Sequence, residues 1–171
     1  MNLTNIGNYM ATANIPSGMQ VHLINPSDQS FGTAVITPRW LYVLAAATPE
    51  AFGDAVLCDE TLEQLDPASI RAGDIVGIGI HTANALRGYE VGKLARSVGA
   101  WVIFGGIHAT LYPEESLELG GAHAVVKGDG DVIWSEAVYD CLCGSPRSIY
   151  EGGRTEPDEV LLEIHAARQR R

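Results

Sequence analysis

The sequence has few basic residues. Lysine and arginine together number 11 of the 171 residues, against 21 aspartates and glutamates, and the formal net charge is −10. Nucleic acids and anionic membrane surfaces are bound by a concentrated basic face, which this balance does not supply. The basic cluster of Arg168, Arg170 and Arg171 lies at the end of the chain, where we expect it to be solvated and to complement a helix dipole. The composition therefore argues against nucleic acid and membrane as partners.

Cysteine and long apolar runs are also scarce. The three cysteines, Cys58, Cys141 and Cys143, are too few for a disulfide framework, and their spacing fits no zinc site. We expect them to be reduced thiols with a structural role. No uninterrupted apolar run approaches the length that spans a membrane, and residues 1–20 lack the pattern of a signal peptide. These absences predict a cytoplasmic location.

The remaining composition is that of one globular domain. Apolar residues make up 46% and charged residues 19% of the chain, which is long enough to bury a core. Residues 1–19 are rich in Asn, Thr, Ala and Gly without periodicity, and we expect them to form a mobile extension. Residues 20–150 are expected to form the domain. Residues 151–171 are expected to include a charged C-terminal helix, with Thr155 as its candidate cap.

Five short apolar segments recur along the chain, at 21–24, 55–58, 75–80, 101–104 and 124–126. The segment 75–80 is apolar on both faces, as a central parallel strand must be. Strands that alternate with helices predict a parallel sheet covered on both faces. The commonest order for five such units is 2-1-3-4-5. The sequence therefore predicts an α/β, flavodoxin-like (Rossmann-like) fold with five parallel strands.

The segments between these strands carry helical patterns. Thr37-Pro38 and Pro113 are predicted to open helices, and Thr48 and Gly144 to follow helix ends. The expected core-facing positions are Leu41, Leu44 and Ala45; Leu62 and Leu65; Leu86, Tyr89, Leu94, Ala95 and Val98; and Val132, Ile133, Ala137, Val138 and Leu142.

In this fold ligands bind at the carboxyl ends of the strands. A ligand site is therefore expected among the loops at 25–37, 59–60, 81–84, 105–112 and 128–131. A phosphoacceptor receiver domain would need acidic residues after the first and third strands, where this chain has Asn25 and His81-Thr82. The first loop fits a flavin-phosphate loop poorly, because it is long and holds Pro26. No phosphate-loop or dinucleotide-binding glycine motif is present either.

Three motifs follow three of the predicted strands in order. Asp74 precedes Val76-Gly77-Ile78, and Thr82 follows that strand; residues 105–110 read Gly-Gly-Ile-His-Ala-Thr, with Pro-Glu-Glu at 113–115; and residues 128–131 read Gly-Asp-Gly-Asp. Two dipeptides nearer the N-terminus, Asn25-Pro26 after the first predicted strand and Thr37-Pro38 at the end of the first loop, belong to the same pattern. In this order the motifs, over roughly residues 21–150, resemble the cobalamin (vitamin B12)-binding domain at the front of B12-dependent radical-SAM enzymes.

The resemblance implies a bound cobalamin with its dimethylbenzimidazole tail displaced from cobalt (base-off) and extended beside the sheet. Gly105-Gly106 would leave room for the tail, although close helix–sheet packing would also explain them. Thr82 would offer a hydroxyl or, alternatively, cap a helix, and the long first loop would lie beneath the corrin. The candidate cofactor-binding residues are Asn25, Pro26, Ser27, Phe31, Thr37, Asp59, His81, Thr82, Gly105, Gly106, Ile107, His108, Gly128, Asp129 and Gly130.

The chain departs from better-known B12 domains in two ways. They carry Asp-x-His-x-x-Gly in the first loop, whereas residues 28–32 read Asp-Gln-Ser-Phe-Gly, so no protein histidine is expected as the lower cobalt ligand. Water, Phe31 or nothing would face the metal. The Cys-x-x-x-Cys-x-x-Cys loop that holds a 4Fe–4S cluster for S-adenosylmethionine is also missing, so we expect a catalytic domain in cis or in trans, with residues 151–171 as a linker toward it.

No residue of this chain is assigned a catalytic role or a metal-ligand role. His81 and His108 fall on the predicted rim, but no cysteine or carboxylate is spaced to complete a metal site with them. We expect His108 to hydrogen-bond its own neighbours in the Gly-Gly loop. Two functions remain open: a cobalamin-binding module for methyl transfer or cyclase-type chemistry, and a flavodoxin-like regulatory or interaction domain that binds no B12.

Overall fold

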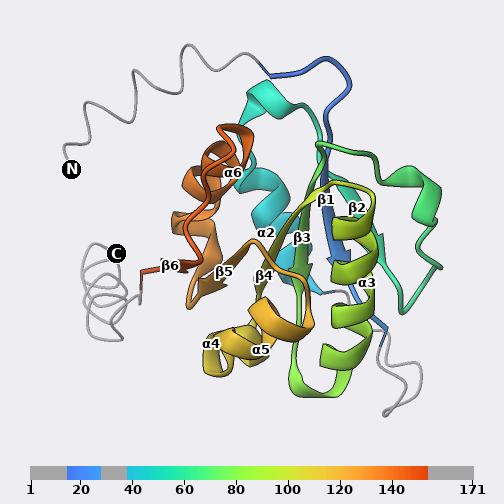
Figure 1. Ribbon diagram of the computed structural model, residues 1–171, viewed down its shortest axis with the longest axis vertical. Helices are drawn as coiled ribbons and strands as arrows, with labels where there is room; N and C mark the ends of the chain where they lie inside the picture. Colours follow the sequence, from blue (N-terminus) through green and yellow to red (C-terminus); the bar gives the residue numbers. More distant parts are fainter. Residues whose placement is uncertain (1–14, 28–37, 154–171) are drawn as a thin grey trace, which may run out of the picture.

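The computed structural model describes residues 15–27 and 38–153, and within them the chain forms a six-stranded parallel sheet (Figure 1). The strand order is β2-β1-β3-β4-β5-β6. The strands are β1 (Val21–Asn25), β2 (Val56–Asp59), β3 (Ile75–Gly79), β4 (Trp101–Gly105), β5 (Ala124–Lys127) and β6 (Ile149–Glu151), and every neighbouring pair is parallel. The five predicted strands and their order 2-1-3-4-5 are confirmed.

The sixth strand corrects the prediction of a five-stranded sheet. Strand β6 lies on the edge, beside β5, and alternates exposed, buried, exposed. Its buried residue, Tyr150, donates a hydrogen bond from its hydroxyl to Asp140 and accepts one from the backbone N–H of Arg147. One buried side chain in three residues gives too short a pattern for sequence reasoning to identify a strand.

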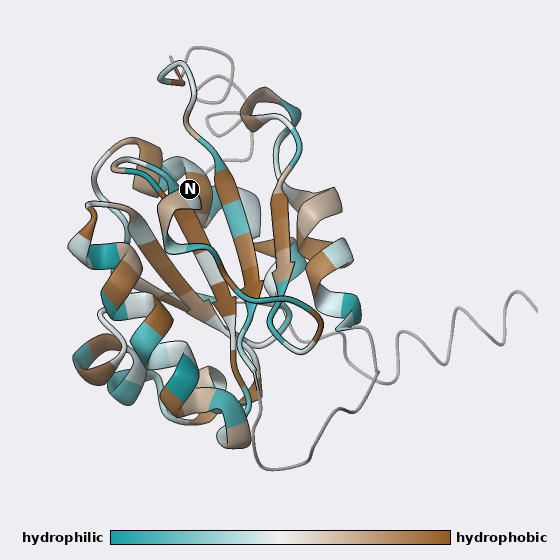
Figure 2. Ribbon diagram, turned by 90° about the vertical axis from the view of Figure 1, so that its right-hand side faces the viewer, coloured by the Kyte–Doolittle hydropathy of each residue, from teal (hydrophilic) through white to brown (hydrophobic). Residues whose placement is uncertain are grey.

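Helices cover both faces of the sheet, as predicted (Figure 2). The α-helices are α2 (Arg39–Ala47), α3 (Ala85–Ser97), α4 (Ile107–Leu111), α5 (Pro113–Leu119) and α6 (Trp134–Leu142); short 3-10 turns are η1 (Glu50–Phe52), η2 (Pro67–Ser69), η3 (Thr82–Asn84) and η4 (Gly130–Val132). Residues of α3, α4 and α5 share one apolar cluster with the sheet, and residues of α2 and α6 share the other. The sheet is therefore enclosed by two separate cores.

Several helix predictions are confirmed. Helix α5 begins at Pro113, α2 is followed by Thr48, and α6 ends two residues before Gly144, which has a φ of 73°. Pro38 is the N-cap of α2 rather than its first helical residue, and Thr37 lies outside the described residues.

Other helix predictions are wrong. Leu62 is 64% exposed, and the segment after β2 forms a turn and η2 instead of the predicted helix, although Leu65 packs against the core as expected. In α3 the small residues Gly88 and Gly92 lie on the buried face, while Leu86 is 79% exposed. Val98 is exposed too, and Val132 belongs to η4 and is also exposed. Tyr89 and Ala95 of α3 are buried as predicted, but the leucine spacing misplaces the rest of this face because glycine and alanine bring α3 close to the sheet.

The two ends of the chain, predicted to be an extension and a linker helix, are described only in part. Of the predicted extension 1–19, residues 1–14 lie outside the described residues, while Ile15 and Met19 pack against the α2–α6 core. Of the predicted linker helix 151–171, residues 154–171 also lie outside them. Within the described ranges, no helix has both the length and the apolar character needed to cross a membrane.

Only Cys143 is expected to react quickly with a thiol reagent in the native protein at pH 8. Burial and nearby carboxylates raise the pKa of Cys58 to about 11, and burial with an adjacent carboxylate raises the pKa of Cys141 to about 12. Because the thiolate is the nucleophile, about one Cys58 in a thousand is ionised at that pH. Ellman's reagent should titrate a single fast thiol, and Cys143→Ser should remove that phase. A fast phase that survives this substitution would contradict the burial of the other two thiols.

Candidate binding site at the carboxyl edge of the sheet

A cavity of about 490 Å³ lies at the carboxyl ends of β1, β3, β4 and β5, on the side of the sheet covered by α2 and α6. It occurs where the strand order changes direction between β1 and β3, the place where parallel α/β sheets bind ligands. The predicted site residues among its lining are Asn25, His81, Gly105, Gly106, Ile107, Gly128, Asp129 and Gly130. The structure thus brings the loops after the first, third, fourth and fifth strands to one cavity.

The floor of this cavity is built from glycine backbone. A Cβ atom on Gly77 would lie 2.7 Å from the Trp134 ring, and one on Gly79 would lie 2.5 Å from the Trp40 ring. A Cβ on Gly106 would lie 2.5 Å from the carbonyl oxygen of Ile80, and the φ of Gly106 is 91°. Any larger residue at these positions would collide with neighbours. The glycines therefore let the aromatic rings and the loop after β4 lie directly against β3.

The lining also contains residues that the sequence analysis did not select. Trp40, Val43 and Leu44 come from α2, and Trp134 comes from the start of α6. The alternation of glycine in β3 was a usable signal, because Gly77 and Gly79 lie two residues apart and point to the same face. Of the helical residues that cover that face, the leucine spacing indicated Leu44 but neither tryptophan.

The loop at 128–130 is held in place by two other elements. The backbone N–H of Gly128 donates to the hydroxyl of Thr110 in α4, at 3.1 Å. On the other side a Cβ on Gly152 would lie 2.1 Å from the carbonyl oxygen of Asp129. The end of β6 and helix α4 thus fix the backbone that lines this side of the cavity.

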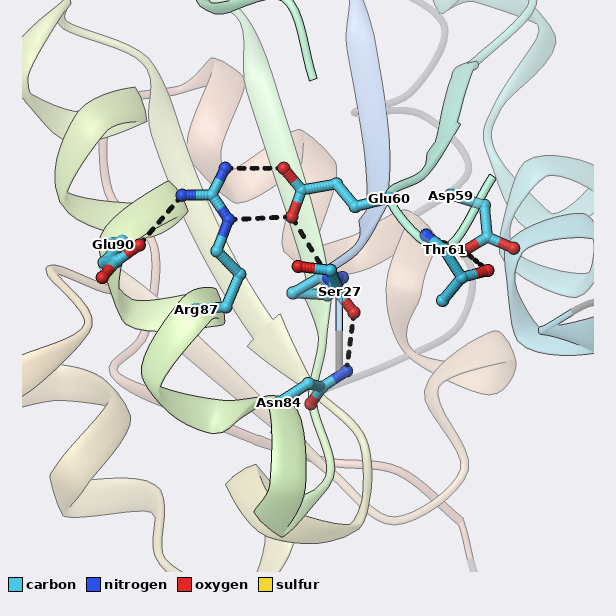
Figure 3. A network of polar contacts seen from close by, with 8 residues as sticks. Ser27, Asp59, Glu60, Thr61, Asn84, Arg87 and Glu90 are labelled. Carbon is cyan, nitrogen blue, oxygen red and sulfur yellow. Dashed lines mark hydrogen bonds and ion pairs between the residues drawn. The ribbon is translucent and has the colours of Figure 1, made fainter. Parts of the chain in front are cut away.

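Five other predicted site residues lie outside the cavity lining: Pro26, Ser27, Asp59, Thr82 and His108. Figure 3 shows the polar network in which three of them take part, at the ends of β1 and β2. Asp59 Oδ1 accepts hydrogen bonds from the Asn25 amide and from the backbone and hydroxyl of Thr61. Phe31 and Thr37, also predicted, lie outside the described residues.

Around this network, Glu60 forms a two-pronged ion pair with Arg87 of α3, at 2.6 and 2.9 Å, and accepts from the backbone of Ser27. The hydrogen bond to Glu60 raises the pKa of the Arg87 guanidinium above its usual range. The buried amide of Asn84 donates to the carbonyl of Pro26 and accepts from the backbone of His81. These contacts connect the loops after β1, β2 and β3, so they position the cavity edge.

His108 corrects one expectation about the loop after β4. Its ring is buried and contacts the hydroxyls of Thr82, at 3.3 Å, and Tyr89, at 3.1 Å. Its side chain therefore joins α4 to η3 and α3, instead of bonding its own neighbours in the Gly-Gly loop. Thr82 is the first residue of η3, whose N-cap is His81, so Thr82 is not the helix cap.

The site is suited to binding more than to acid–base chemistry. Its lining is mainly apolar, and the loops at 105–107 and 128–130 add backbone polar groups. Within residues 15–27 and 38–153, no three His, Cys, Asp or Glu side chains are grouped to hold a metal ion. Fold and cavity together define an α/β domain with a doubly covered parallel sheet and a ligand-sized cavity at its carboxyl edge.

Comparisons with known proteins point to methyltransferases. Over 141 residues the chain is 28% identical to bacteriochlorophyllide d C-12(1)-methyltransferase of Chlorobaculum tepidum, a match that covers 79% of this chain and 30% of the relative. Over 97 residues it is 31% identical to bacteriochlorophyllide d C-8(2)-methyltransferase of the same organism, covering 56% of this chain and 21% of the relative. The chain thus spans less than a third of the length of these two relatives. No family model matches it.

Solved structures of the radical S-adenosylmethionine methyltransferase TsrM from Kitasatospora setae are similar as well. The form with cobalamin and a 4Fe–4S cluster bound superposes with a TM-score of 0.58 at 25% identity, covering 74% of this chain and 27% of TsrM. The form with tryptophan and a SAM analogue gives a TM-score of 0.57, also at 25% identity, over 74% of this chain and 26% of TsrM. The described domain is therefore similar to part of a larger methyltransferase.

Proposed function

We propose that this chain is the cobalamin-binding module of a B12-dependent radical-SAM enzyme, acting in methyl transfer or cyclase-type chemistry in the cytoplasm. The observation that carries the proposal is the glycine-floored cavity at the carboxyl edge of β3 and β4. The likeness to TsrM, which has been solved with cobalamin bound, supports the same assignment. The radical-SAM domain, in cis or in trans, would supply the 4Fe–4S cluster and S-adenosylmethionine.

The described residues fit the tail of cobalamin. A cavity of about 490 Å³ lies in the range that small-molecule ligands occupy. The backbone of Gly105 is open and can approach a flat ring closely, whereas Gly77 and Gly79 are covered by the rings of Trp134 and Trp40, which form the aromatic wall of the same cavity. The backbone of Asp129 and Gly130 borders the same space and can hydrogen-bond a nucleotide sugar or phosphate, while the N–H of Gly128 already donates to Thr110. The displaced benzimidazole nucleotide is the part of the cofactor that this cavity would hold.

The residues of this chain would bind the cofactor, orient it and shield it from water. When bound, cobalamin supplies a cobalt centre that can carry a methyl group. The apolar walls from α2 and α6 would exclude water from the tail, and the loop at 105–107 would fix its depth along β3. The first loop has no histidine, so we propose that the protein provides no imidazole ligand below the cobalt.

Anaerobic titration with hydroxocobalamin tests the proposal. We expect a visible spectrum of the tail-displaced form, saturation at a single cobalamin per chain, and colour that survives desalting. Gly105→Leu should abolish binding, because a Cβ there has room in the fold and the side chain would enter the cavity. Ala46→Leu, which adds similar bulk on the exposed side of α2, is the matched control.

An unchanged spectrum and colourless protein after desalting would reject the proposal. The chain would then be a regulatory or interaction domain of the same fold. Equal binding by wild type and Gly105→Leu would place the cofactor somewhere other than this cavity.

A further inference from the structure

The side-chain position of Gly79 is taken by the indole of Trp40. A Cβ on Gly79 would lie 2.5 Å from Cζ2 and 2.6 Å from Cε2 of this ring. Trp40 belongs to the first turn of α2 and lines the cavity that also exposes the backbone of Gly105 and Gly106. A bulky aromatic ring thus lies against the strand end where the tail of a ligand would be inserted.

The second indole in the cavity differs from the first. Trp134 is 2% exposed, and its Nε1 donates a hydrogen bond to Thr48 Oγ1 at 2.9 Å. Burial and this bond fix the ring, so Trp134 belongs to the core. Trp40 is half-buried, and within the described part of the chain its indole N–H makes no hydrogen bond. Of the two rings, Trp40 is the more exposed, so a ligand in the cavity can reach it.

A planar heteroaromatic ring is the ligand chemistry that Trp40 suits. Aromatic rings bind each other face to face with an offset or edge to face, and both arrangements need a flat partner beside a flat surface. In this cavity the Trp40 ring, which lies against the backbone of Gly79, supplies that flat surface. Polar contacts from the loops would set orientation, while stacking on Trp40 would recognise the ring itself.

We propose that Trp40 is the residue that selects corrinoids by their tail, through stacking on the planar base at the end of the nucleotide. This inference rests on the proposed binding of cobalamin and adds a specificity role to the same cavity. It requires that Trp40 contribute to the affinity for cobalamin and contribute nothing to the affinity for the corrin ring.

Cobinamide, the same corrin without the nucleotide tail, separates these two contributions. Wild type should bind cobalamin at least about tenfold more tightly than cobinamide. Trp40→Ala should weaken cobalamin binding about 10- to 100-fold, the range found when alanine replaces an aromatic residue that stacks on a base. It should leave cobinamide affinity within about twofold, which is the scatter expected away from the contact.

Two further variants serve as controls for the effect of Trp40→Ala. Trp40→Phe keeps an aromatic face and should recover part of the loss, which a purely structural role would not explain. Tyr42→Ala, an exposed aromatic position on the same helix, should bind both corrinoids like wild type. Thermal melts of each variant check that the fold is retained, and Trp40→Phe replaces Trp40→Ala if the latter unfolds.

The outcomes are distinct. Failure of wild type to bind either corrinoid overturns the proposed function itself. Binding of cobalamin without discrimination from cobinamide, or an equal loss of both corrinoids in Trp40→Ala, overturns the role of Trp40 and leaves the proposed function standing.

Discussion

Replacing Gly106 with alanine should lower the free energy of unfolding by about 3–5 kcal/mol, from backbone strain plus a forced close contact. Gly106 adopts φ 91° and ψ 178°, a region open almost only to glycine. Its added Cβ would lie 2.5 Å from the oxygen and 2.9 Å from the nitrogen of Ile80. These are backbone atoms, so they cannot rotate away as a side chain could.

The backbone of Ile80 is also held from two sides. Its N–H donates to the carbonyl of Gly105, and its carbonyl accepts from the N–H of His108, at 2.9 and 3.2 Å. Moving Ile80 to relieve the contact would strain both hydrogen bonds and shift the cavity rim. Equilibrium urea unfolding followed by circular dichroism measures the effect.

The neighbouring glycine supplies the control. Gly105 has no positive φ, and a Cβ there meets nothing closer than 3.7 Å. Gly105→Ala should therefore change the unfolding free energy by less than about 1 kcal/mol. If Gly106→Ala is no more destabilising than Gly105→Ala, the loop after β4 does not depend on glycine at 106.

The sheet could be predicted well because burial on both faces makes a strand apolar at every position. Segment 75–80 has this property, and its strand β3 is buried at four of five positions. Strand order followed from connectivity and handedness rather than from any side chain. The edge strand β6 lacked the burial signal, since only Tyr150 is buried, although α6 connects it to β5 as other helices connect neighbouring strands.

The helices were predicted less well because the local signal was misleading. Leucine spacing suggested that Leu86 faces the core, yet Gly88 and Gly92 do so, since a Cβ on either would collide with Ile80 or with the Gly120 carbonyl. Close packing of a helix on a sheet favours small residues, which hydrophobic periodicity does not detect. Which face of α3 is buried therefore depends on its packing against the sheet and not on the spacing of its leucines.

The rim of the cavity was predictable, whereas its walls were not. Strand ends can be located in the sequence, so loops 105–107 and 128–130 were found. Trp40 and Trp134 cover the glycines of β3 because of how α2 and α6 lie across the sheet. The sequence pattern of a single helix does not determine this arrangement. The side chains of Thr82 and His108 point away from the cavity, and His108 contacts both Thr82 and Tyr89. The sequence did not predict these directions.

Asp74 is the site of the second large expected effect: Asp74→Ala should lower the free energy of unfolding by about 3–5 kcal/mol, the loss typical of removing one partner from a buried charged network. The carboxylate is buried, accepts from the backbone N–H groups of Gln20 and Arg71 at 2.9 and 2.8 Å, and contacts His22 Nε2 at 3.1 Å. His22 is equally buried, so its ring would be left without this partner.

Asp74→Asn keeps the shape and one acceptor oxygen, so it should lose about half as much as the alanine variant. Asp54→Ala, at an exposed position, should stay within about 0.5 kcal/mol of wild type in the same urea experiment. A double-mutant cycle with His22→Ala should give a coupling of about 0.5–3 kcal/mol, because the two side chains touch. Additive losses would mean that the contact stabilises nothing.

A variant of Asp74 also tests whether the motif around β3 serves folding, ligand binding or both. It precedes β3, so it lies at the amino edge of the sheet, whereas the cavity lies at the carboxyl edge. Below its unfolding transition, Asp74→Asn should therefore bind cobalamin as wild type does, in spite of its lower stability. Weakened binding by the folded variant would mean that the two edges of β3 are coupled. Unchanged binding would mean that the motif's aspartate serves the folding of β1 and β3 and does not contribute to the ligand site.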